Sequence, residues 1–276
     1  MFELPEFVIL SRQMNDTLKG KTVKLGQLGN SPGKFVWYNR SPEEFERLTC
    51  AKTVGSAWAR GKWLFLPLQP HYRLVLGECG GKVLYHAPQS KLPQKYHLLI
   101  GFDDDSALSV TTQMWGAMEL YEEGEEQKRQ YIKDMRPTPS DAEFTLEYFC
   151  ALLDELTQQK QRSVKALLTQ EQLIPGLGNA IAQDILFRAQ LHPKHAIAEM
   201  TQEQRRTLFE AIVNTVRCVI EQGGRNDEYN LYNERGGYVR QMDNNAVGQP
   251  CPRCGAAIEK MKYLGGACYF CPNCQH

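Results

Sequence analysis

The stretch CPRCGAAIEKMKYLGGACYFCPNC, residues 251–274, contains two Cys-x-x-Cys pairs separated by sixteen residues. Two residues between cysteines let one tight turn present both thiolates, and this spacing is typical of a four-cysteine zinc site. The intervening KMKYLGGACYF predicts a β-hairpin. We expect one structural zinc ion bound by Cys251, Cys254, Cys271 and Cys274. Two separate redox pairs are the alternative, but a redox motif would accompany a βαβ pattern.

The other cysteines fit this interpretation. Five of the nine lie in the last 26 residues, which favours a metal site over a disulfide scaffold spread through the chain. Cys268 breaks the spacing of the pairs, and we interpret it as a strand residue and not a ligand. The four remaining cysteines are expected to be small buried hydrophobic residues: Cys50, Cys79, Cys150 and Cys218.

The bulk composition describes an ordinary globular chain. It has 276 residues, of which 42% are hydrophobic and 23% charged, enough for two domains with separate cores. No run approaches the roughly 18 to 20 apolar residues of a membrane helix. The start, MFELPEFVIL, lacks the pattern of a secretion signal. We expect a cytoplasmic monomer without a membrane partner.

The net charge of zero argues against nucleic-acid binding, because DNA is held largely by Lys and Arg on its phosphates. Residues 121–160, however, contain ten of the 32 acidic side chains and five of the 32 basic ones. The rest of the chain therefore carries an excess of positive charge, and it has enough basic residues for a DNA-binding groove.

Two kinds of pattern divide the chain. Short segments rich in Val, Leu and aromatic residues run from about residue 21 to 120, as in KWLFLPL (62–68) and YHLLIGF (96–102), and predict an antiparallel β domain. A helix before it is predicted between Pro5 and Gly20. After the breaker RPTPS (136–140), apolar spacing of three to four predicts helices. The fold class is α+β, with domains at 1–130, 131–241 and 242–276.

One turn in the helical half has the chemistry of a phosphate site. In Pro175-Gly176-Leu177-Gly178-Asn179 the glycines permit a tight turn, and Asn179 opens the helix NAIAQDILFRAQ. The positive end of that helix faces whatever lies in front of it. The alternative is an Asn cap between packed helices, with no ligand.

Three motifs together resemble the formamidopyrimidine-DNA glycosylase and endonuclease VIII family: Glu3-Leu4-Pro5-Glu6, the turn at 175–179 followed by LFRAQLHP, and the zinc hairpin ending CPNCQ. Their order matches a β-sandwich, a helix-two-turns-helix unit and a zinc finger. The resemblance implies a DNA-repair enzyme that binds double-stranded DNA at a damaged or abasic nucleotide and cleaves the N-glycosidic bond of the damaged base.

The resemblance also implies roles for particular residues. Glu3 matches an acid that assists sugar opening and proton transfer. Lys62, in the segment ARGKWL, matches a lysine that contacts phosphate beside the lesion, and we count it with Glu3 and residue 2 among the catalytic candidates. The further candidates for contacts to the DNA backbone are His97, Lys165, Asn179 and Tyr238.

The sequence departs from the family at the position that supplies its nucleophile. Phe2 stands where the family has a proline whose amine, freed by Met removal, forms a Schiff base with the sugar. Because the initiator Met is normally removed only before small residues, we expect Met1 to stay and the residue-2 nitrogen to be a non-nucleophilic amide. The abasic-lyase reaction by the family route is therefore not expected.

Two DNA-contacting segments depart as well. Gly266 stands where the finger of the family has an arginine, and Gln113-Met114-Trp115 replaces a segment that contains arginines. Trp115 is either a wedge between bases or a core residue. The loop GGRNDEYNLYNERGG (223–237) is the expected contact to the lesion, but its residues do not identify that lesion.

We therefore predict a DNA N-glycosylase with Glu3 as general acid/base. Three alternatives stay open: a catalytically degenerate protein that binds lesions without cutting, a glycosylase that activates water through Glu3 without a Schiff base, and a zinc-ribbon RNA-binding or ribosome-associated protein.

Overall fold

The computed structural model describes residues 1–29, 35–113, 115–159 and 161–276. The chain folds as two compact units. The first combines Met1–Met135 with Val219–Tyr238, and the second combines Arg136–Cys218 with Val239–His276. The first unit is therefore closed by a segment from the far end of the helical half, which brings residues 219–238 to the N-terminus.

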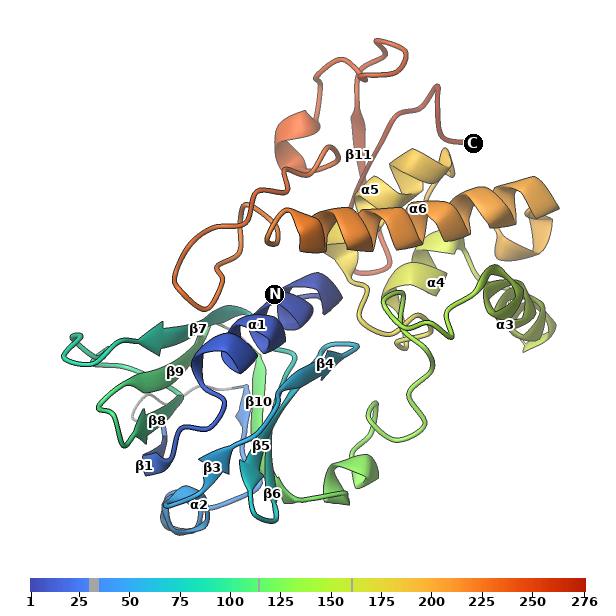
Figure 1. The fold of residues 1–276 in the computed structure, drawn as a ribbon. Coiled ribbons are helices and arrows are strands. Elements are labelled where there is room, and N and C mark those ends of the chain that lie inside the picture. The colour runs from blue at the N-terminus through green and yellow to red at the C-terminus, as the bar shows by residue number, and fades with distance from the viewer. Residues whose placement is uncertain (30–34, 114, 160) are drawn as a thin grey trace. The chain divides into compact units, whose positions relative to one another are not determined.

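Two sheets form the body of the first unit (Figure 1). One sheet has the order β1-β8-β9-β7, with bounds Val23–Leu28, Leu98–Phe102, Ala107–Thr112 and Gly81–His86. The other has the order β2-β10-β6-β5-β3, with bounds Val36–Trp37, Gly116–Glu122, Tyr72–Gly77, Trp63–Gln69 and Thr53–Val54, and β4 (Trp58–Arg60) pairs with β5.

Strand β5 illustrates how the alternation of side chains builds the core. Leu64, Leu66 and Leu68 are fully buried and join a cluster that also contains residues of the other sheet, such as Leu108. The alternate residues of β5 face the other way, into a smaller cluster. The sandwich predicted from the sequence is confirmed, with its main core between the two sheets.

The pairing of the strands differs from the prediction at one place. β10 and β2 are parallel, with Gly116 opposite Val36, whereas the other strand pairs of the first unit are antiparallel. A purely antiparallel pattern was expected because hydrophobic alternation is the same in both kinds of ladder and does not reveal strand direction.

The predicted N-terminal helix is present as α1 (Leu4–Thr17). Pro5 lies in its first turn, where the missing N–H costs no helical hydrogen bond, and Phe7, Leu10 and Met14 bury one face at the spacing of a helix. Two short helices complete this unit, α2 (Pro42–Thr49) and η1 (Glu125–Lys128).

The second unit is helical, as predicted, and ends in the finger. Its helices are α3 (Leu146–Gln159), α4 (Val164–Thr169), α5 (Asn179–Ala189), η2 (Ile197–Glu199), η3 (Asn244–Ala246) and α6 (Gln202–Glu221), the last of which continues into the first unit. The finger hairpin pairs β11 (Glu259–Tyr263) with β12 (Gly266–Phe270). The predicted boundaries at 130 and 241 stay a prediction.

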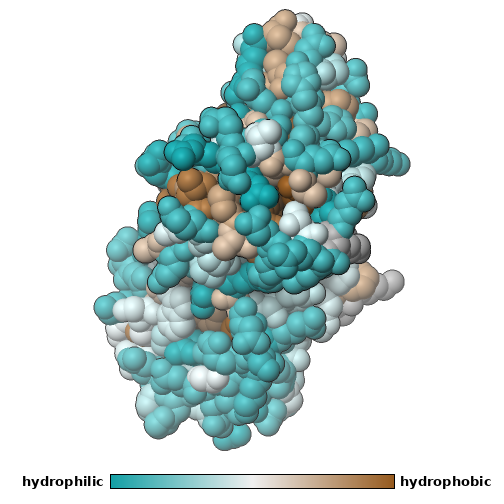
Figure 2. Space-filling model, turned by 90° about the vertical axis from the view of Figure 1, so that its right-hand side faces the viewer, coloured by the Kyte–Doolittle hydropathy of each residue, from teal (hydrophilic) through white to brown (hydrophobic). Residues whose placement is uncertain are grey.

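The surface is mainly hydrophilic on the face in Figure 2, in keeping with a mean hydropathy of −0.46. In the described part of the chain, no helix is long and apolar enough to cross a membrane. Of the four scattered cysteines that were expected to be buried, Cys79 is buried, Cys150 and Cys218 are half-buried, and the expectation is wrong for Cys50, which is exposed after the end of α2.

Candidate active site, nucleic-acid contacts and metal centre

Phe2 is a core residue of the first unit. Its side chain is fully buried and packs edge-on against Phe7, with 5.8 Å between ring centroids. Its backbone N–H donates to the carbonyl of Cys79 across 2.9 Å. The nitrogen of residue 2 is thus an amide held in a hydrogen bond beside the sheet, and the side chain anchors the start of α1.

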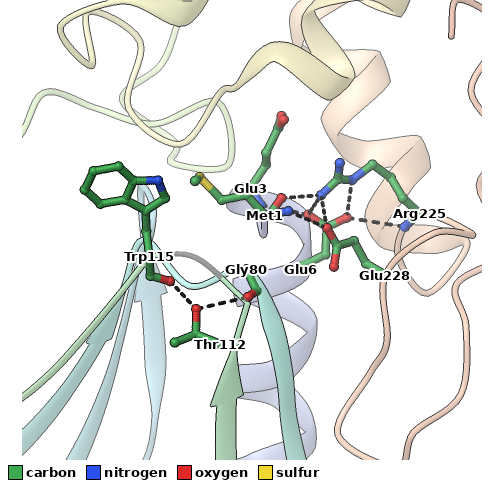
Figure 3. A network of polar contacts seen from close by, with 8 residues as sticks. All are labelled: Met1, Glu3, Glu6, Gly80, Thr112, Trp115, Arg225 and Glu228. Carbon is green, nitrogen blue, oxygen red and sulfur yellow. Dashed lines mark hydrogen bonds and ion pairs between the residues drawn. The ribbon is translucent and has the colours of Figure 1, made fainter. Parts of the chain in front are cut away.

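The terminal ammonium and the carbonyl of Met1 each have a hydrogen-bond partner (Figure 3). Its terminal ammonium lies 2.8 Å from Oε1 of Glu228, and its carbonyl accepts a hydrogen bond of 2.8 Å from Nη2 of Arg225. A side chain at Gly80 would place its Cβ 3.2 Å from the Cα of Met1, so the backbone at Gly80 leaves little room beside the N-terminal residue.

Glu6 connects this arrangement to α1. Its carboxylate accepts from the N–H of Glu3 across 2.9 Å and from Nε and Nη2 of Arg225 across 2.9 and 3.1 Å. Glu6 is 4% exposed and Arg225 2%. A buried carboxylate is therefore met by a buried guanidinium through two charge-assisted bonds, the geometry that best offsets desolvation.

Opposing effects set the charges of this network. Burial disfavours a charged Arg225, but the negative charges of Glu6 and Glu3 outweigh it and hold the pKa of the guanidinium above its ordinary value. For Glu228, burial outweighs the Met1 ammonium and Arg225, and its pKa is raised. Glu228 is thus the carboxyl in the network that is easier to protonate than an ordinary glutamate.

A cavity of about 260 Å³ adjoins the network. Met1 and Glu228 line it together with Lys82, Trp115 and Tyr229. Lys82 Nζ lies 3.9 Å from the centroid of the Tyr229 ring and donates to the side chain of Asn233. The cavity combines an amine, a carboxylate and aromatic rings, which suits a planar polar ligand.

Glu3, the predicted acid/base, starts α1 next to this cavity. It is 4% exposed, and Figure 3 shows its side chain extending away from the pair of Glu6 and Arg225. Among the described residues, those that line the cavity do not include Glu3. Its catalytic role stays a prediction.

Trp115 belongs to an aromatic stack on the surface of the first unit. Its ring lies 4.5 Å from that of Phe35 and 5.4 Å from that of Trp37, with interplanar angles of 27° and 20°. Phe35 and Trp37 are each about two-fifths exposed. The tryptophan is therefore supported by partly exposed rings and is not a residue of the deep core. Met114, beside it, lies outside the described residues.

Three other candidates for DNA contacts lie in the first unit. Lys62 is half-buried in the turn between β4 and β5. His97 is 8% exposed, its Nδ1 accepts from the N–H of Thr112 across 3.0 Å, and burial lowers its pKa. Tyr238 is 3% exposed, and its backbone pairs with that of Gly224. Their contacts to DNA stay predictions. Lys62 is the least buried of the three side chains.

Lys165 and Asn179, both in the second unit, meet at the finger hairpin. Lys165 is 1% exposed, and its Nζ donates to the carbonyl of Tyr263 across 2.7 Å. Asn179 Nδ2 donates to the carbonyl of Ala267 across 3.3 Å. A Cβ added at Gly266 would lie 3.3 Å from Oδ1 of Asn179 and 3.5 Å from Nζ of Lys165. Gly266, which stands where the finger of the family has an arginine, therefore lies beside both of these side chains.

The predicted start of a helix at Asn179 is confirmed, although its cap differs. The N-cap of α5 is Gly178, and Gly176 has a φ of 96°, which favours glycine. The side chain of Asn179 turns to the hairpin and to Gln183. Asn179 is therefore the first residue of the helix and not its cap, and the phosphate site at this turn stays a prediction.

The four predicted zinc ligands converge in the second unit. The sulfur atoms of Cys251, Cys254, Cys271 and Cys274 all lie within 4.8 Å of one another. The Sγ atoms of Cys251 and Cys274 are 3.9 Å apart, and those of Cys254 and Cys271 are 3.4 Å apart. A tetrahedron with Zn–S bonds of about 2.3 Å needs sulfur separations of about 3.8 Å, so the four thiolates fit a zinc ion.

Cys268, in contrast, is a strand residue, as predicted. It is fully buried and lies opposite Met261 in the hairpin. It is absent from the group of four that could hold a metal among the described residues.

Sequence reasoning missed Arg225 and Glu228 as individual residues. They lie in the loop that was singled out for its place in the family, but without residue-level roles. The only local signal was the charged run after Gly223 and Gly224. Their partners, Glu6 and Met1, lie more than 200 positions away, and no local pattern predicts such a pairing.

Comparison with known proteins agrees along the whole chain. Residues 1–118 match the pattern described as formamidopyrimidine-DNA glycosylase N-terminal domain, and residues 135–229 match the formamidopyrimidine-DNA glycosylase H2TH domain. Proteins named formamidopyrimidine-DNA glycosylase from Bacillus cereus and Chloroflexus aurantiacus are each 30% identical to it, with all of this chain and 99% and 98% of theirs covered.

Solved structures have the same fold. The Lactococcus lactis Fpg in complex with DNA containing an abasic site superposes with a TM-score of 0.83 at 23% identity, and the MutM (Fpg) protein of Thermus thermophilus with 0.82 at 24%. Both comparisons cover 99% of this chain, and 99% and 98% of those chains respectively.

Proposed function

The chain belongs to the formamidopyrimidine-DNA glycosylase family, and on that premise we propose that it binds double-stranded DNA at a damaged or abasic nucleotide and cleaves the N-glycosidic bond of a damaged base. The observation that carries this proposal is the cavity beside the N-terminus, in which an amine, a carboxylate and aromatic rings meet. Its volume of about 260 Å³ is below the ~300 to 1,000 Å³ of pockets for drug-sized ligands and suits one base turned out of the duplex.

Glu3 is the general acid/base of this proposal. Two carboxylates belong to the first turn of α1 and its cap, and Glu6 is committed to the buried guanidinium of Arg225. Glu3 is the one whose side chain extends away from that pair. A positioned acid/base of this kind contributes about 10² to 10⁴ in rate.

The nitrogen of residue 2 has no place in this mechanism. It is an amide that donates to the carbonyl of Cys79, so its lone pair is delocalised and cannot attack a sugar carbon. With Met1 in place, we therefore expect release of the base through water activated by Glu3, and we do not expect abasic-lyase activity by the residue-2 route. Phe2 contributes packing only.

DNA is held through phosphate contacts in both units. In the second unit, no carboxylate among the described residues pairs with the buried ammonium of Lys165, whose partner is a carbonyl. Together with the positive end of α5 at Asn179, it favours an anion. In the first unit we assign phosphate contacts to Lys62, and backbone contacts of lower weight to His97 and Tyr238.

Trp115 is the residue that we place against DNA bases. Its stack with Phe35 and Trp37 supports a flat apolar surface beside the cavity that Trp115 also lines. Aromatic rings stack on bases without regard to sequence. In this proposal the Trp115 ring fills the space that the turned-out nucleotide leaves in the base stack.

The metal of the finger is zinc in this proposal, one ion with a structural role. Four thiolates close its coordination sphere, so that no position is open for a substrate. The ion would hold the hairpin whose carbonyls contact Lys165 and Asn179. We place the protein in the cytoplasm as a monomer.

Labelled duplexes that carry an oxidised base or an abasic site test the proposal. Release of the base with retention of the bound product would support it, whereas retention without release would favour the lesion-binding alternative. Equal affinity for damaged and undamaged duplexes would contradict both.

A further inference from the structure

Lys82 places an ammonium group in the wall of the cavity of the first unit. Its Nζ lies 3.9 Å from the centroid of the Tyr229 ring and donates to Oδ1 of Asn233 across 2.7 Å. In the part of the chain that the structure describes, this ammonium forms no ion pair with a carboxylate. Because an ammonium has three N–H donors, the bond to Asn233 does not exhaust them. The cavity wall therefore contains a cation that can still donate to a ligand.

Backbone pairing holds Lys82 and Tyr229 in a fixed relation. Lys82 belongs to β7, and Tyr85 of the same strand donates its N–H to the carbonyl of Leu231 across 2.8 Å. The Leu231 side chain is fully buried in the main core of the first unit. The segment that carries Tyr229 is thus attached to the strand that carries Lys82, and the ammonium and the ring meet through these contacts alone.

A short hairpin fixes the orientation of the Tyr229 ring. The backbones of Tyr229 and Arg235 pair, and the N–H of Asn230 donates to the carbonyl of Glu234 across 2.8 Å. Nε and Nη2 of Arg235 donate to the phenol oxygen of Tyr229 across 3.3 and 3.2 Å. Arg235 therefore holds the ring, and the ring holds the Lys82 ammonium by a cation–π contact. Such preorganisation lowers the entropy cost of binding a ligand.

The charges around the cavity favour a neutral ligand over an anion. Asp227 and Glu228 line the same cavity as Lys82. Two carboxyl groups disfavour a phosphate there, whereas a neutral carbonyl oxygen can accept from the ammonium without that repulsion. Trp115, which also lines the cavity, offers a flat ring to a flat ligand. The base of a nucleotide is therefore a better partner for Lys82 than its phosphate.

We propose that Lys82 is a specificity-determining residue whose ammonium donates a hydrogen bond to a carbonyl oxygen of the base in the cavity, and that Tyr229 and Asn233 are positioning residues that aim this ammonium. The inference rests on the proposed function, because it requires a base to enter the cavity. A base that presents a carbonyl oxygen to Lys82 is preferred over one that presents an amino group, since two donors cannot form a hydrogen bond with each other.

Equilibrium binding of three duplexes tests the role of Lys82. The first carries 8-oxoguanine or 5-hydroxyuracil on a 2′-fluoro sugar, which resists cleavage of the N-glycosidic bond. The second has tetrahydrofuran at that position, which keeps the phosphates but lacks the base, and the third is undamaged. Lys82→Met should weaken binding of the first duplex by roughly 10- to 100-fold, the range for a hydrogen bond from a charged group, and should leave the second unchanged. The matched control Lys19→Met, an exposed change, should alter neither.

Two results would overturn the inference while the proposed function stands. Equal affinity of wild type and Lys82→Met for the first duplex would show that the ammonium makes no contact to the base. A loss shared by the first and second duplexes, with a salt slope lower by about 1, would assign Lys82 to a phosphate. Failure of the proposed function has a different signature: wild type would bind the damaged duplexes no better than the undamaged one, and this inference would fall with it.

Variants of Tyr229 test whether its ring acts through Lys82. Tyr229→Leu removes the ring and should lower the affinity for the first duplex relative to the second, whereas Tyr229→Phe keeps the ring and should restore most of that loss. The double variant Lys82→Met with Tyr229→Leu should lose no more than Lys82→Met alone, because the two residues then act as one unit. Additive losses would show that Tyr229 contacts the base by itself and would overturn its positioning role.

Discussion

Arg225 and Glu6 are 219 positions apart in the sequence and form a two-pronged ion pair inside the first unit, with Nε to Oε1 at 2.9 Å and Nη2 to Oε2 at 3.1 Å. The pair ties the segment after α6 to the first turn of α1. Through the carbonyl of Met1 it also fixes the N-terminus. The geometry of the candidate active site therefore depends on an ion pair that contains no residue of the predicted catalytic set.

Breaking this pair from one side should destabilise the protein strongly. Arg225→Met leaves the buried carboxylate of Glu6 without its partner, and we expect a loss of about 3 to 5 kcal/mol in the free energy of unfolding. Urea unfolding of the full chain measures it. The double variant Glu6→Leu with Arg225→Met should recover much of the loss. A single variant within about 0.5 kcal/mol of wild type, as expected for surface changes, would contradict the finding.

The raised pKa of Glu228 predicts how stability depends on pH. Because the folded chain binds the proton of Glu228 more tightly than the unfolded chain does, protonation favours folding. This contribution is fully present below the ordinary glutamate pKa of about 4.3 and is lost as pH rises through the raised value. Glu228→Gln removes the titrating group and therefore this pH-dependent contribution. The free energy of unfolding of wild type minus that of the variant should fall as pH rises above about 4.3. A difference that is constant with pH would refute the assignment.

Zinc should bind at one equivalent through the four finger cysteines. Cys271→Ser should lower the zinc content and weaken DNA binding, because the hairpin that meets Lys165 and Asn179 would lose its support. Metal analysis and a binding assay measure the two effects. Cys268→Ser is the matched control within the same hairpin, since it should retain the metal. Freshly purified protein without zinc would end this claim.

Phosphate contacts should make DNA binding depend on salt. Lys62→Ala should reduce the slope of log affinity against log salt by about 1, the effect of one lost contact. Titrations of a damaged duplex at several salt concentrations measure the slope. Lys19→Ala, an exposed change just after α1, serves as the control. An unchanged slope in Lys62→Ala would show that the turn between β4 and β5 faces away from DNA.

Loss of Glu3 should impair chemistry more than binding. Glu3→Gln keeps the size of the side chain but not its proton transfer, and base release should fall by on the order of 10² or more. Single-turnover assays on an oxidised-base duplex measure the rate, and the affinity for an abasic duplex serves as the control. If Glu3→Gln released the base at the wild-type rate, another group would be the acid.

Much of the site followed from the sequence because its signals are local. The cysteines of the finger lie two residues apart in each pair, so one turn presents both thiolates whatever the rest of the fold does. Likewise Gly176 and Gly178 precede a helix that begins at Asn179 as predicted. The direction of the β2–β10 pair could not be predicted, because parallel and antiparallel ladders share the same side-chain alternation.

The sequence by itself determined the fold class, the four finger cysteines and the replacement at residue 2, since each depends on residue types at short spacing. Only the tertiary structure decided what that replacement does. The fold buries the side chain of Phe2 in the core. It also brings Arg225 and Glu228 to Met1, although they lie more than 200 residues away in the sequence. The physical reason is that a buried charge requires a partner of opposite charge. The tertiary structure decides which residue lies close enough to be that partner, and distance along the sequence does not.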